Sequence, residues 1–346
     1  IKRYLAFAPG DPFSYQKLGE TQVNLRNSER FKEILVRADR GSVKDYRVPV
    51  TVDLQDGPSK RLRVGAGYET DTGPRAFLFY QDVNVFDRGH EFDGEVTLAG
   101  LTQGAAARYV VPSSKSFLSY TAFKGVLQRE DVPAYTTYLG MFEIDRARKL
   151  GEGRTGGAFV RFFYADSEVG GLRSRSYITL TGVRFAVQRY NNLVRPTRGY
   201  KMSAELRGTS RFFASDQTFL QCLSEGSLVR RLSRNFTLHA RGQIGLTVQK
   251  ESVRDLPAPL RFFAGGDRSV RGYAYQSLGP KDQEGKVVGG RNLLVGSLEL
   301  ERSFFDHWAA AVFYDLGNAF NNLGEIRLAQ GAGIGLRYYS RVGPLR

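Results

Sequence analysis

Apolar and polar residues alternate along much of this chain, and this alternation constrains the fold more than any other feature. It is clearest between residues 235 and 249, in the sequence NFTLHARGQIGLTVQ. The odd positions hold mostly polar or small residues, whereas the even positions hold Phe236, Leu238, Ala240, Gly242, Ile244, Leu246 and Val248. Because successive side chains of a β-strand point to opposite faces, this run predicts a strand with one apolar and one polar face.

The same alternation recurs in fourteen segments after residue 60. The segments follow one another without helical patterns between them, which indicates antiparallel hairpins. Most reach the roughly 9–11 residues that a tilted strand needs to cross a bilayer. Their approximate spans are 61–70, 73–85, 90–101, 104–113, 116–127, 134–149, 153–170, 176–191, 198–210, 216–232, 235–249, 292–304, 308–320 and 327–340.

Two folds contain such strands. A soluble sandwich or barrel turns the apolar faces inward, whereas a membrane barrel turns them towards lipid and surrounds a hydrated lumen. Full charges recur on the polar face, as at Glu205, Arg207, Arg241 and Glu299, and aromatic residues gather near strand ends as in an aromatic girdle. We therefore predict a mainly β fold, a transmembrane antiparallel β-barrel. The aromatic residues near strand ends are Tyr80, Tyr120, Tyr138, Tyr190, Tyr200, Trp308, Tyr338 and Tyr339.

The formal charge of +15 indicates an anionic neighbour: nucleic acid, an anionic membrane surface or polyanionic lipid. Nucleic-acid binding would not explain fourteen two-faced strands, so we favour lipopolysaccharide contact and a polar lumen. No run of 18 apolar residues occurs, so no transmembrane helix is expected, and the first residues, IKRY, do not begin a signal segment. The single cysteine, Cys222, excludes an intrachain disulfide and is expected to be a small packing residue.

Residues 1–56 have a different pattern and are expected to form a small α+β module. Ser14 can cap a helix over residues 15–28, and two strands are predicted at 31–39 and 48–56. The turn-rich sequence DGPSK at 56–60 marks the boundary, so we place the barrel at residues 57–346.

The gap between the eleventh and twelfth predicted strands, residues 250–291, is the longest in the chain. If residues 1–56 are periplasmic, connections after odd-numbered strands face outward, and this long loop is external. Short inner turns and long outer loops are typical of membrane barrels. A loop of this length in a compact fold is usually functional.

The long loop contains LRFFAGGDRSVRGY at residues 260–273, and the thirteenth predicted strand contains FYDLG at 313–317. With these motifs nearly the whole chain resembles the BamA/TamA superfamily of outer-membrane assembly barrels, and within it the TamA branch most. The superfamily patterns V-R-G-[FY], F-x-D-x-G and G-x-x-E match, in this order, Val270, Arg271, Gly272 and Tyr273, then Phe313, Asp315 and Gly317, then Gly296 and Glu299.

The resemblance implies a barrel of 16 strands, about 14 of them in this chain, with the chain ending in strand 15. It implies that residues 1–56 are the latter part of a periplasmic POTRA domain and that the barrel lies in a Gram-negative outer membrane. The implied partners are client outer-membrane proteins, lipid and lipopolysaccharide, and a TamB-like inner-membrane protein reached through the POTRA region. Neither a cofactor nor nucleic acid is expected.

In the superfamily the long loop folds into the lumen, where its arginine meets carboxylates of the barrel wall. The alternation agrees, because Asp315 and Glu299 fall on the lumen-facing sets of their strands. We therefore predict that Arg271 enters the barrel and meets Asp315 with Glu299 adjacent; the alternative is a solvated arginine on an exposed loop. Gly265, Gly266 and Gly272 would permit close backbone approach. The residues predicted to hold the loop are Asp267, Val270, Arg271, Gly272, Tyr273, Glu299, Phe313, Asp315 and Gly317.

The superfamily also implies a weak lateral seam at the first strand. Gly65 and Gly67 would weaken this strand, although crowding in the lumen would explain them equally well. An edge with free backbone groups can pair with a client strand. The residues assigned to the seam strand are Leu62, Val64, Gly65, Ala66, Gly67 and Tyr68.

These observations favour a non-enzymatic factor that assembles or inserts β-barrel or autotransporter proteins; the alternative is a two-partner-type secretion pore. A barrel enzyme is disfavoured, because the only histidines, His90, His239 and His307, show no Ser/His/acid spacing. No Cys/His cluster suggests a metal site.

Overall fold

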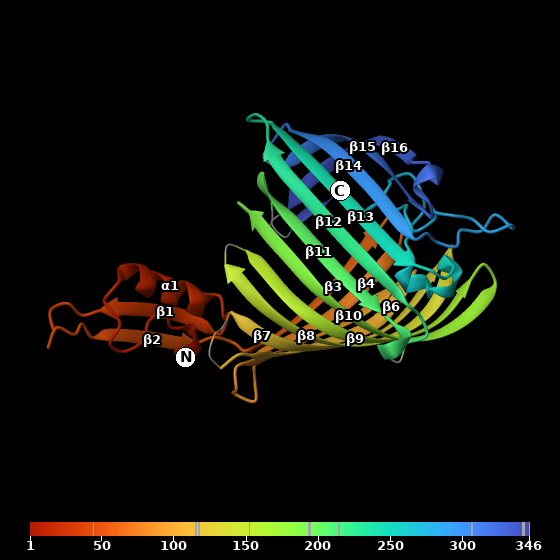
Figure 1. The fold of residues 1–346 in the computed structure, drawn as a ribbon. Helices are drawn as coiled ribbons and strands as arrows, with labels where there is room; N and C mark the ends of the chain where they lie inside the picture. Colours follow the sequence, from red (N-terminus) through yellow and green to blue (C-terminus); the bar gives the residue numbers. More distant parts are fainter. Residues whose placement is uncertain are drawn as a thin grey trace.

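The computed structural model describes residues 1–346 except residues 44, 115, 117, 152, 193–194, 214, 306, 341–342 and 346. It consists of a small N-terminal module and a large curved sheet (Figure 1). The module contains η1 (Lys2–Tyr4), α1 (Tyr15–Arg26), β1 (Phe31–Ala38) and β2 (Val50–Asp56).

Helix α1 begins where the sequence predicts. Oγ of Ser14 accepts a hydrogen bond from the backbone N–H of Lys17 at 3.4 Å, which satisfies one of the free donors of the first turn. Leu18 and Leu25 are buried, and α1 packs against β1, which pairs with β2 in antiparallel fashion. The helix–strand–strand order of residues 1–56 is therefore present, and its assignment to a POTRA domain stays a prediction.

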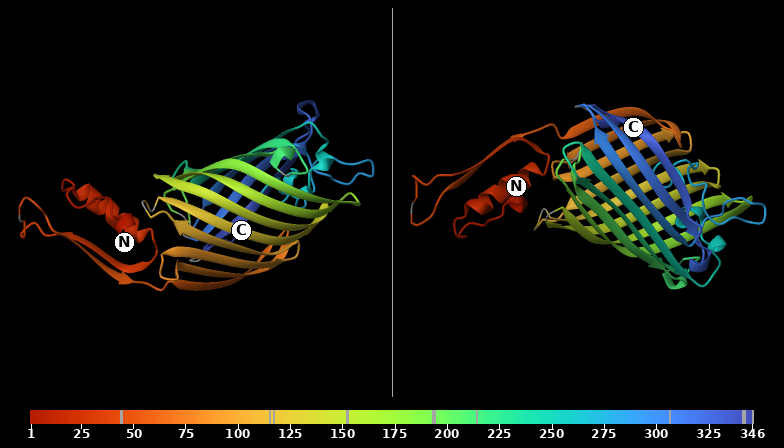
Figure 2. Two further views of the ribbon diagram at one scale, coloured as in Figure 1. Left: turned by 60° about the horizontal axis from the view of Figure 1, so that its bottom comes forward. Right: turned by 90° about the horizontal axis from the view of Figure 1, so that it is seen from above.

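Fifteen antiparallel strands form one sheet, and each pairs with its neighbours in the sequence. The sheet curls into a barrel (Figure 2). Among the described strands, β3 and β17 stand at the two ends of the sheet order and do not pair with each other. The strands are β3 (Lys60–Glu69), β4 (Gly73–Val85), β5 (His90–Ala99), β6 (Thr102–Pro112), β7 (Ser119–Val132), β8 (Tyr135–Gly151), β9 (Arg154–Val169), β10 (Leu172–Tyr190), β11 (Arg198–Thr209), β12 (Phe219–Arg231), β13 (Phe236–Gln249), β14 (Asn292–Ser303), β15 (Trp308–Phe320), β16 (Ala329–Ser340) and β17 (Gly343–Leu345).

The apolar set of each long strand faces outward. Leu127 and Ile334 are 69% and 86% exposed, whereas Glu143, Gln221 and Asp315 are at most 3% exposed on the lumen side. A soluble protein would bury the first group and expose the second. This arrangement is that of a membrane barrel, and the predicted fold class is confirmed. Among the described residues, no helix has the length and apolar character needed to cross a bilayer.

Strand β7 ends at Val132, whereas the sequence predicts its end at residue 127. The polar residues after Leu127 look like a turn, yet they continue to pair with β8. Asp131 explains how, because it accepts hydrogen bonds from the side chains of Arg129 and Thr136, at 2.7 and 2.9 Å. Thr136 is the cross-strand partner of Asp131, and a polar pair of this kind extends the hairpin beyond its apolar part.

The N-terminal module contacts one end of the barrel. Arg3 donates a hydrogen bond to the carbonyl of Gly89 in the β4–β5 turn at 3.0 Å, and Arg61 of β3 forms an ion pair with Glu29 at 2.6 Å. We call this the proximal end of the barrel and the opposite end, which carries the 250–291 loop, the distal end (Figure 1).

Candidate functional site in the barrel lumen

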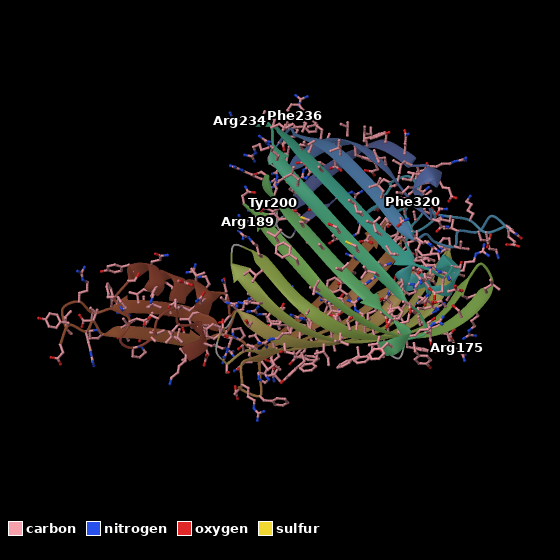
Figure 3. All side chains as sticks on the ribbon, viewed as in Figure 1. Arg175, Arg189, Tyr200, Arg234, Phe236 and Phe320 are labelled. Atoms are coloured by element: carbon pink, nitrogen blue, oxygen red, sulfur yellow. The ribbon has the colours of Figure 1, made fainter. Side chains whose placement is uncertain are left out.

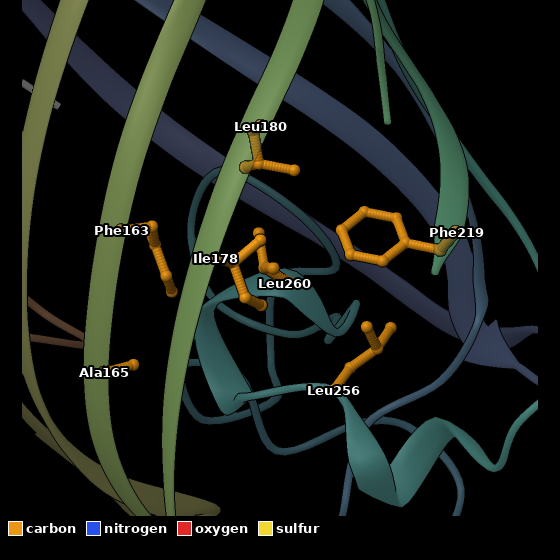
Figure 4. Packing of buried hydrophobic residues seen from close by; sticks show 7 residues of the cluster. All are labelled: Phe163, Ala165, Ile178, Leu180, Phe219, Leu256 and Leu260. Carbon is orange, nitrogen blue, oxygen red and sulfur yellow. The ribbon is translucent and has the colours of Figure 1, made fainter. Parts of the chain in front are cut away.

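The 250–291 loop packs against the inner wall at the distal end. Leu256 and Leu260 are 1% and 2% exposed and belong to one buried cluster with residues of β9, β10 and β12 (Figure 4). The wall residues of this cluster are Phe163, Ala165, Ile178, Leu180 and Phe219. Burial of several such side chains, at about 1.5–3 kcal/mol each, holds this part of the loop to one wall.

A second buried cluster joins the loop to the β7–β8 and β9–β10 hairpins. Ala258 and Val288 of the loop pack there with Val132, Tyr135 and Val169. The ring of Phe263 lies 5.1 Å from that of Tyr135, centroid to centroid. The loop is therefore attached to two neighbouring parts of the wall by apolar contacts.

Arg261 holds the loop together internally. Its guanidinium group is buried and donates hydrogen bonds to the carbonyls of Leu256, Val288 and Arg254 at 2.7, 2.9 and 2.7 Å. Burial lowers the pKa of Arg261 to about 10, so the side chain remains charged at neutral pH. One cation thus ties the beginning of the loop to its end.

Arg271 lies in the lumen against strands β14 and β15. Its Nε and Nη2 donate to the two carboxylate oxygens of Asp315 at 2.7 and 2.8 Å, and its backbone N–H donates to the same carboxylate at 3.0 Å. Nη1 donates to Glu299 at 2.7 Å, and Nη2 also reaches Oγ of Ser297 at 3.2 Å. Asp315 is fully buried, so this two-pronged contact neutralises a charge that water does not reach.

Aromatic and backbone contacts complete the surroundings of Arg271 in the lumen. The guanidinium carbon lies 3.5 Å from the ring centroid of Phe313, close enough for a cation–π contact. Val270 is fully buried, and the carbonyl of Arg271 approaches Gly331 of β16 so closely that a Cβ there would lie 2.2 Å from it. Residue 331 therefore has to lack a side chain for the loop to seat here.

Further charged residues surround the two carboxylates. Arg241 of β13 donates to the carbonyls of Asp267 and Ser269 at 2.8 and 3.1 Å, and its guanidinium lies 3.7 Å from Asp315. Arg337 of β16 forms ion pairs with both Glu299 and Glu301. Loop and wall thus share one network that spans β13 to β16.

Asp267 connects the loop to the first hairpin of the barrel. Its backbone N–H donates to the carboxylate of Asp71 at 2.8 Å, and its own carboxylate accepts from the hydroxyl of Thr70 at 2.8 Å. The adjoining Gly266 has φ of +99°, and a Cβ there would lie 2.7 Å from Asp71. The same short segment therefore touches the β3–β4 turn through Asp267 and strands β14–β16 through Arg271.

A family model described as the Omp85 superfamily domain matches residues 84–346. The chain belongs to the Omp85 superfamily. The resemblance predicted from the loop and strand motifs is thereby confirmed at the level of the superfamily, and the TamA branch stays a prediction.

Curated relatives of this Omp85 chain include bacterial and animal proteins. It is 24% identical over its whole length to the "Outer membrane protein assembly factor BamA" of Nitratidesulfovibrio vulgaris and covers 46% of that protein. Over 42% of its length it is 31% identical to a "Sorting and assembly machinery component 50 homolog" of Xenopus tropicalis and covers 36% of it. The chain thus spans less than half the length of these relatives.

Solved structures share the fold of this Omp85 barrel. BamA from Haemophilus ducreyi lacking POTRA domains 1–3 superposes with a TM-score of 0.80 at 16% identity, over 99% of this chain and 76% of that one. CdiB from Acinetobacter baumannii superposes with a TM-score of 0.63 at 16% identity, over 98% and 65% of the two chains.

The predicted seam strand of the Omp85 barrel is β3, where Leu62, Val64 and Tyr68 face outward and are 64%, 76% and 72% exposed. Gly65 and Gly67 face the lumen side and differ in their surroundings. A Cβ on Gly65 would lie 2.3 Å from the ring of Phe77, whereas a Cβ on Gly67 would meet only Arg75 at 3.6 Å or more. Packing therefore accounts for Gly65, which supports the crowding alternative at this position.

The remaining predicted loop residues have varied surroundings. Tyr273 is 37% exposed, and a Cβ on Gly272 would meet no atom within 4 Å, although its φ of +91° favours glycine. Gly317 of β15 lies against β14, where a Cβ would come within 2.7 Å of the carbonyl of Leu294. The expectation that Cys222 is a small packing residue is wrong, because the residue is exposed on the outward face of β12.

Sequence reasoning missed Arg241, Arg261 and Asp71. The first two donate mainly to backbone carbonyls of the loop, and Asp71 accepts from a backbone N–H. No residue type at a fixed spacing signals such a partner, because every residue has a carbonyl. Arg337 was detectable by alternation, since it shares the inward-facing set of β16 with Gly331 and Gly333.

Proposed function

We propose that this Omp85 barrel is a non-enzymatic factor that assembles or inserts β-barrel or autotransporter proteins in the outer membrane of a Gram-negative bacterium. The observation that carries the proposal is the attachment of Arg271 to Asp315 and Glu299 in an Omp85 barrel. The names of the BamA and component 50 relatives support it, because both refer to assembly.

Strand β3 is the proposed receiving edge for a client. Among the described strands it pairs only with β4, and its outward residues are apolar and exposed. A client strand would form hydrogen bonds with the free backbone groups of such an edge, while the apolar side chains of the client strand face lipid. The contact of Asp71 with Asp267 then makes the loop a neighbour of the receiving hairpin.

The proposal places residues 1–56 in the periplasm as part of a POTRA domain, with a TamB-like inner-membrane partner reached through it. The exposed two-stranded β1–β2 sheet supports this role, since such a sheet offers edges for a further strand. Lipid and lipopolysaccharide are the proposed neighbours of the barrel itself.

Photo-crosslinking in native outer membranes tests the receiving edge. A photoreactive amino acid replaces Val64 on β3, and a matched variant carries it at Leu127 on β7, which is similarly exposed. We expect newly made outer-membrane proteins to crosslink at residue 64 and not at residue 127. Equal yields at both positions, or none at residue 64 during active client synthesis, would contradict the receiving edge.

A two-partner-type secretion pore is the second candidate, because charged residues line the lumen. Arg161, Arg184 and Glu143 form ion pairs there, at 2.6 Å and 3.0 Å from the glutamate. A pore would pass an unfolded secreted chain across liposomes that contain only this barrel. Transport without any membrane insertion of the substrate would favour the pore over the assembly factor.

A further inference from the structure

Arginines are concentrated on one arc of the proximal rim. The segments 189–198 and 229–236, which end and connect β10, β11, β12 and β13, contain six arginines and no acidic residue. Arg302 at the proximal end of β14 extends the arc. Figure 3 shows Arg189 and Arg234 at this end beside Tyr200 and Phe236, and Arg175 at the opposite end.

Three arginines on the strands of this arc, Arg198, Arg230 and Arg302, lie on the outward face, whereas Arg231 falls on the lumen-facing set of β12. Arg198 shares its alternation with exposed Tyr200 on β11, Arg230 with exposed Leu228 on β12, and Arg302 with exposed Leu298 on β14. Each cation therefore stands at the end of a lipid-facing apolar row. Arginine side chains in such a position extend their charged groups to the headgroup level.

Without a bound anion, the positive charges of the arc repel one another. Arg198 and Arg230 are direct partners in the β11–β12 register, and like charges in this position destabilise a sheet. Within the described part of the chain, no carboxylate pairs with the side chains of Arg198, Arg230 or Arg234. An anion between the two opposed guanidinium groups would turn this repulsion into attraction.

Aromatic side chains fix the height of the arc relative to a bilayer. Phe236 is the register partner of Arg302, whose guanidinium carbon lies 5.7 Å from the ring centroid of Phe236. On the next two strands the rings of Trp308 and Tyr338 lie 4.9 Å apart, centroid to centroid, in a tilted arrangement. Such residues concentrate at the boundary between hydrocarbon and headgroups. The guanidinium groups of Arg198, Arg230, Arg234 and Arg302, which we call the arginine arc, are thus at the level of lipid phosphates.

We propose that the arginine arc binds the phosphate headgroups of anionic phospholipids in the leaflet at the proximal end. Guanidinium groups suit this ligand, because they hold phosphate oxygens with two parallel hydrogen bonds. The proposal depends on the membrane-barrel fold and goes beyond the assembly function, which need not hold for it to be true. It also explains part of the net charge of +15 by contact with the leaflet at the proximal end of the barrel.

Native mass spectrometry of the full chain, released from nanodiscs of equal parts phosphatidylglycerol and phosphatidylcholine, tests the proposal. The arc variant carries Arg198→Gln, Arg230→Gln, Arg234→Gln and Arg302→Gln. The control variant loses the same charge from exposed distal residues through Arg211→Gln, Arg254→Gln, Arg268→Gln and Arg327→Gln. We expect the native protein and the control to retain phosphatidylglycerol preferentially and the arc variant to lose this preference.

Single substitutions measure the loss of lipid preference for each arginine, and they disturb folding less than the fourfold variant does. Arg198→Gln alone should lower the preference for phosphatidylglycerol about fivefold, which corresponds to about 1 kcal/mol for one basic side chain at an anionic surface. Heat-modifiable gel mobility shows in each case that the barrel has folded. Unchanged preference in folded Arg198→Gln and Arg230→Gln, or an equal loss in the distal control, overturns the proposal.

The single tryptophan gives an independent readout in bilayers. Trp308 is 41% exposed and begins β15, the strand that follows Arg302. In mixed vesicles, phosphatidylglycerol with brominated acyl chains should quench its fluorescence more than brominated phosphatidylcholine does, and Arg302→Gln should remove the difference. Equal quenching by the two lipids in the native protein counts against the arc.

Discussion

Arg271 is the residue on which the lumen site depends. Its side chain makes two bonds to one carboxylate and one to another, and its backbone adds a third bond to Asp315. A lysine could not reproduce this pattern, because an ammonium group lacks the planar pair of donors. Removal of Arg271 would leave the charge of Asp315 in a site from which water is excluded, and such a loss costs about 3–5 kcal/mol.

Replacement of Arg271 by alanine is therefore expected to release the segment around residue 271 from the barrel wall, while the strands stay folded. Limited proteolysis and hydrogen exchange of residues 262–275 measure this release, and heat-modifiable mobility reports the barrel. Arg268→Ala is the matched control, since the hydrogen bond from Gln243 of the wall is accepted by the backbone carbonyl of Arg268, which the substitution keeps. Retained protection of the loop in Arg271→Ala would show that the apolar clusters alone hold it.

At the residue scale, the pairing partners of Arg271 were predictable because alternation places Asp315 and Glu299 on the lumen side and the superfamily resemblance supplies the arginine. The hydrogen bonds of Arg241 and Arg261 to the loop were not predictable, since their acceptors are backbone carbonyls whose positions depend on the path of the loop. Sequence patterns thus identify pairs of charged side chains better than contacts between a side chain and the backbone.

At the scale of elements, the strands follow from alternation and their ends do not. Thirteen of the fourteen long strands begin and end within about four residues of their predicted bounds, because each needs an apolar row across the bilayer. The distal end of β7 departs most, because polar pairs such as Thr136 with Asp131 prolong the hairpin in water. The course of the 250–291 loop was not predictable, since it follows from tertiary packing rather than from a local period.

The two glycines of strand β3 allow a test of whether glycine is required there by packing or serves to weaken the strand. A methyl group at residue 65 would collide with the ring of Phe77, whereas residue 67 has room for one. We expect Gly65→Ala to lower the free energy of unfolding by about 1–3 kcal/mol and Gly67→Ala to change it little. Urea titrations of barrel folding in vesicles measure both variants. Equal effects would mean that the two glycines act through backbone freedom rather than through the space that Phe77 needs.

For the whole molecule, the loop joins parts of the wall that are far apart in the sheet order. Apolar clusters attach it to β7–β10 and β12, and the Arg271 network attaches it to β14–β16. Its contact with the β3–β4 turn consists of two exposed hydrogen bonds, which are worth about 0.5–1.5 kcal/mol each. The first hairpin is therefore the part of the wall that the loop holds least firmly.

This difference predicts the effect of Asp71→Ala. Loss of the bond from the backbone N–H of Asp267 should speed hydrogen exchange at residue 267 and in the β3–β4 turn, while exchange at residue 271 stays slow. Glu284→Ala, which changes an exposed acid elsewhere in the loop, is the control. Faster exchange at residue 271 as well would mean that the two contacts form one unit instead of separable ones.

The contact between Thr70 and Asp267 joins residues 197 positions apart in the chain. In chain order the first hairpin precedes the loop by more than 160 residues, and Asp315, the partner of Arg271, comes later still. The loop can reach its final seat only when the earliest and nearly the latest strands are both in place, and long-range closures of this kind are slow steps in folding. A seated Arg271 is therefore a marker of barrel maturation: it separates chains that have finished folding from chains that have merely begun.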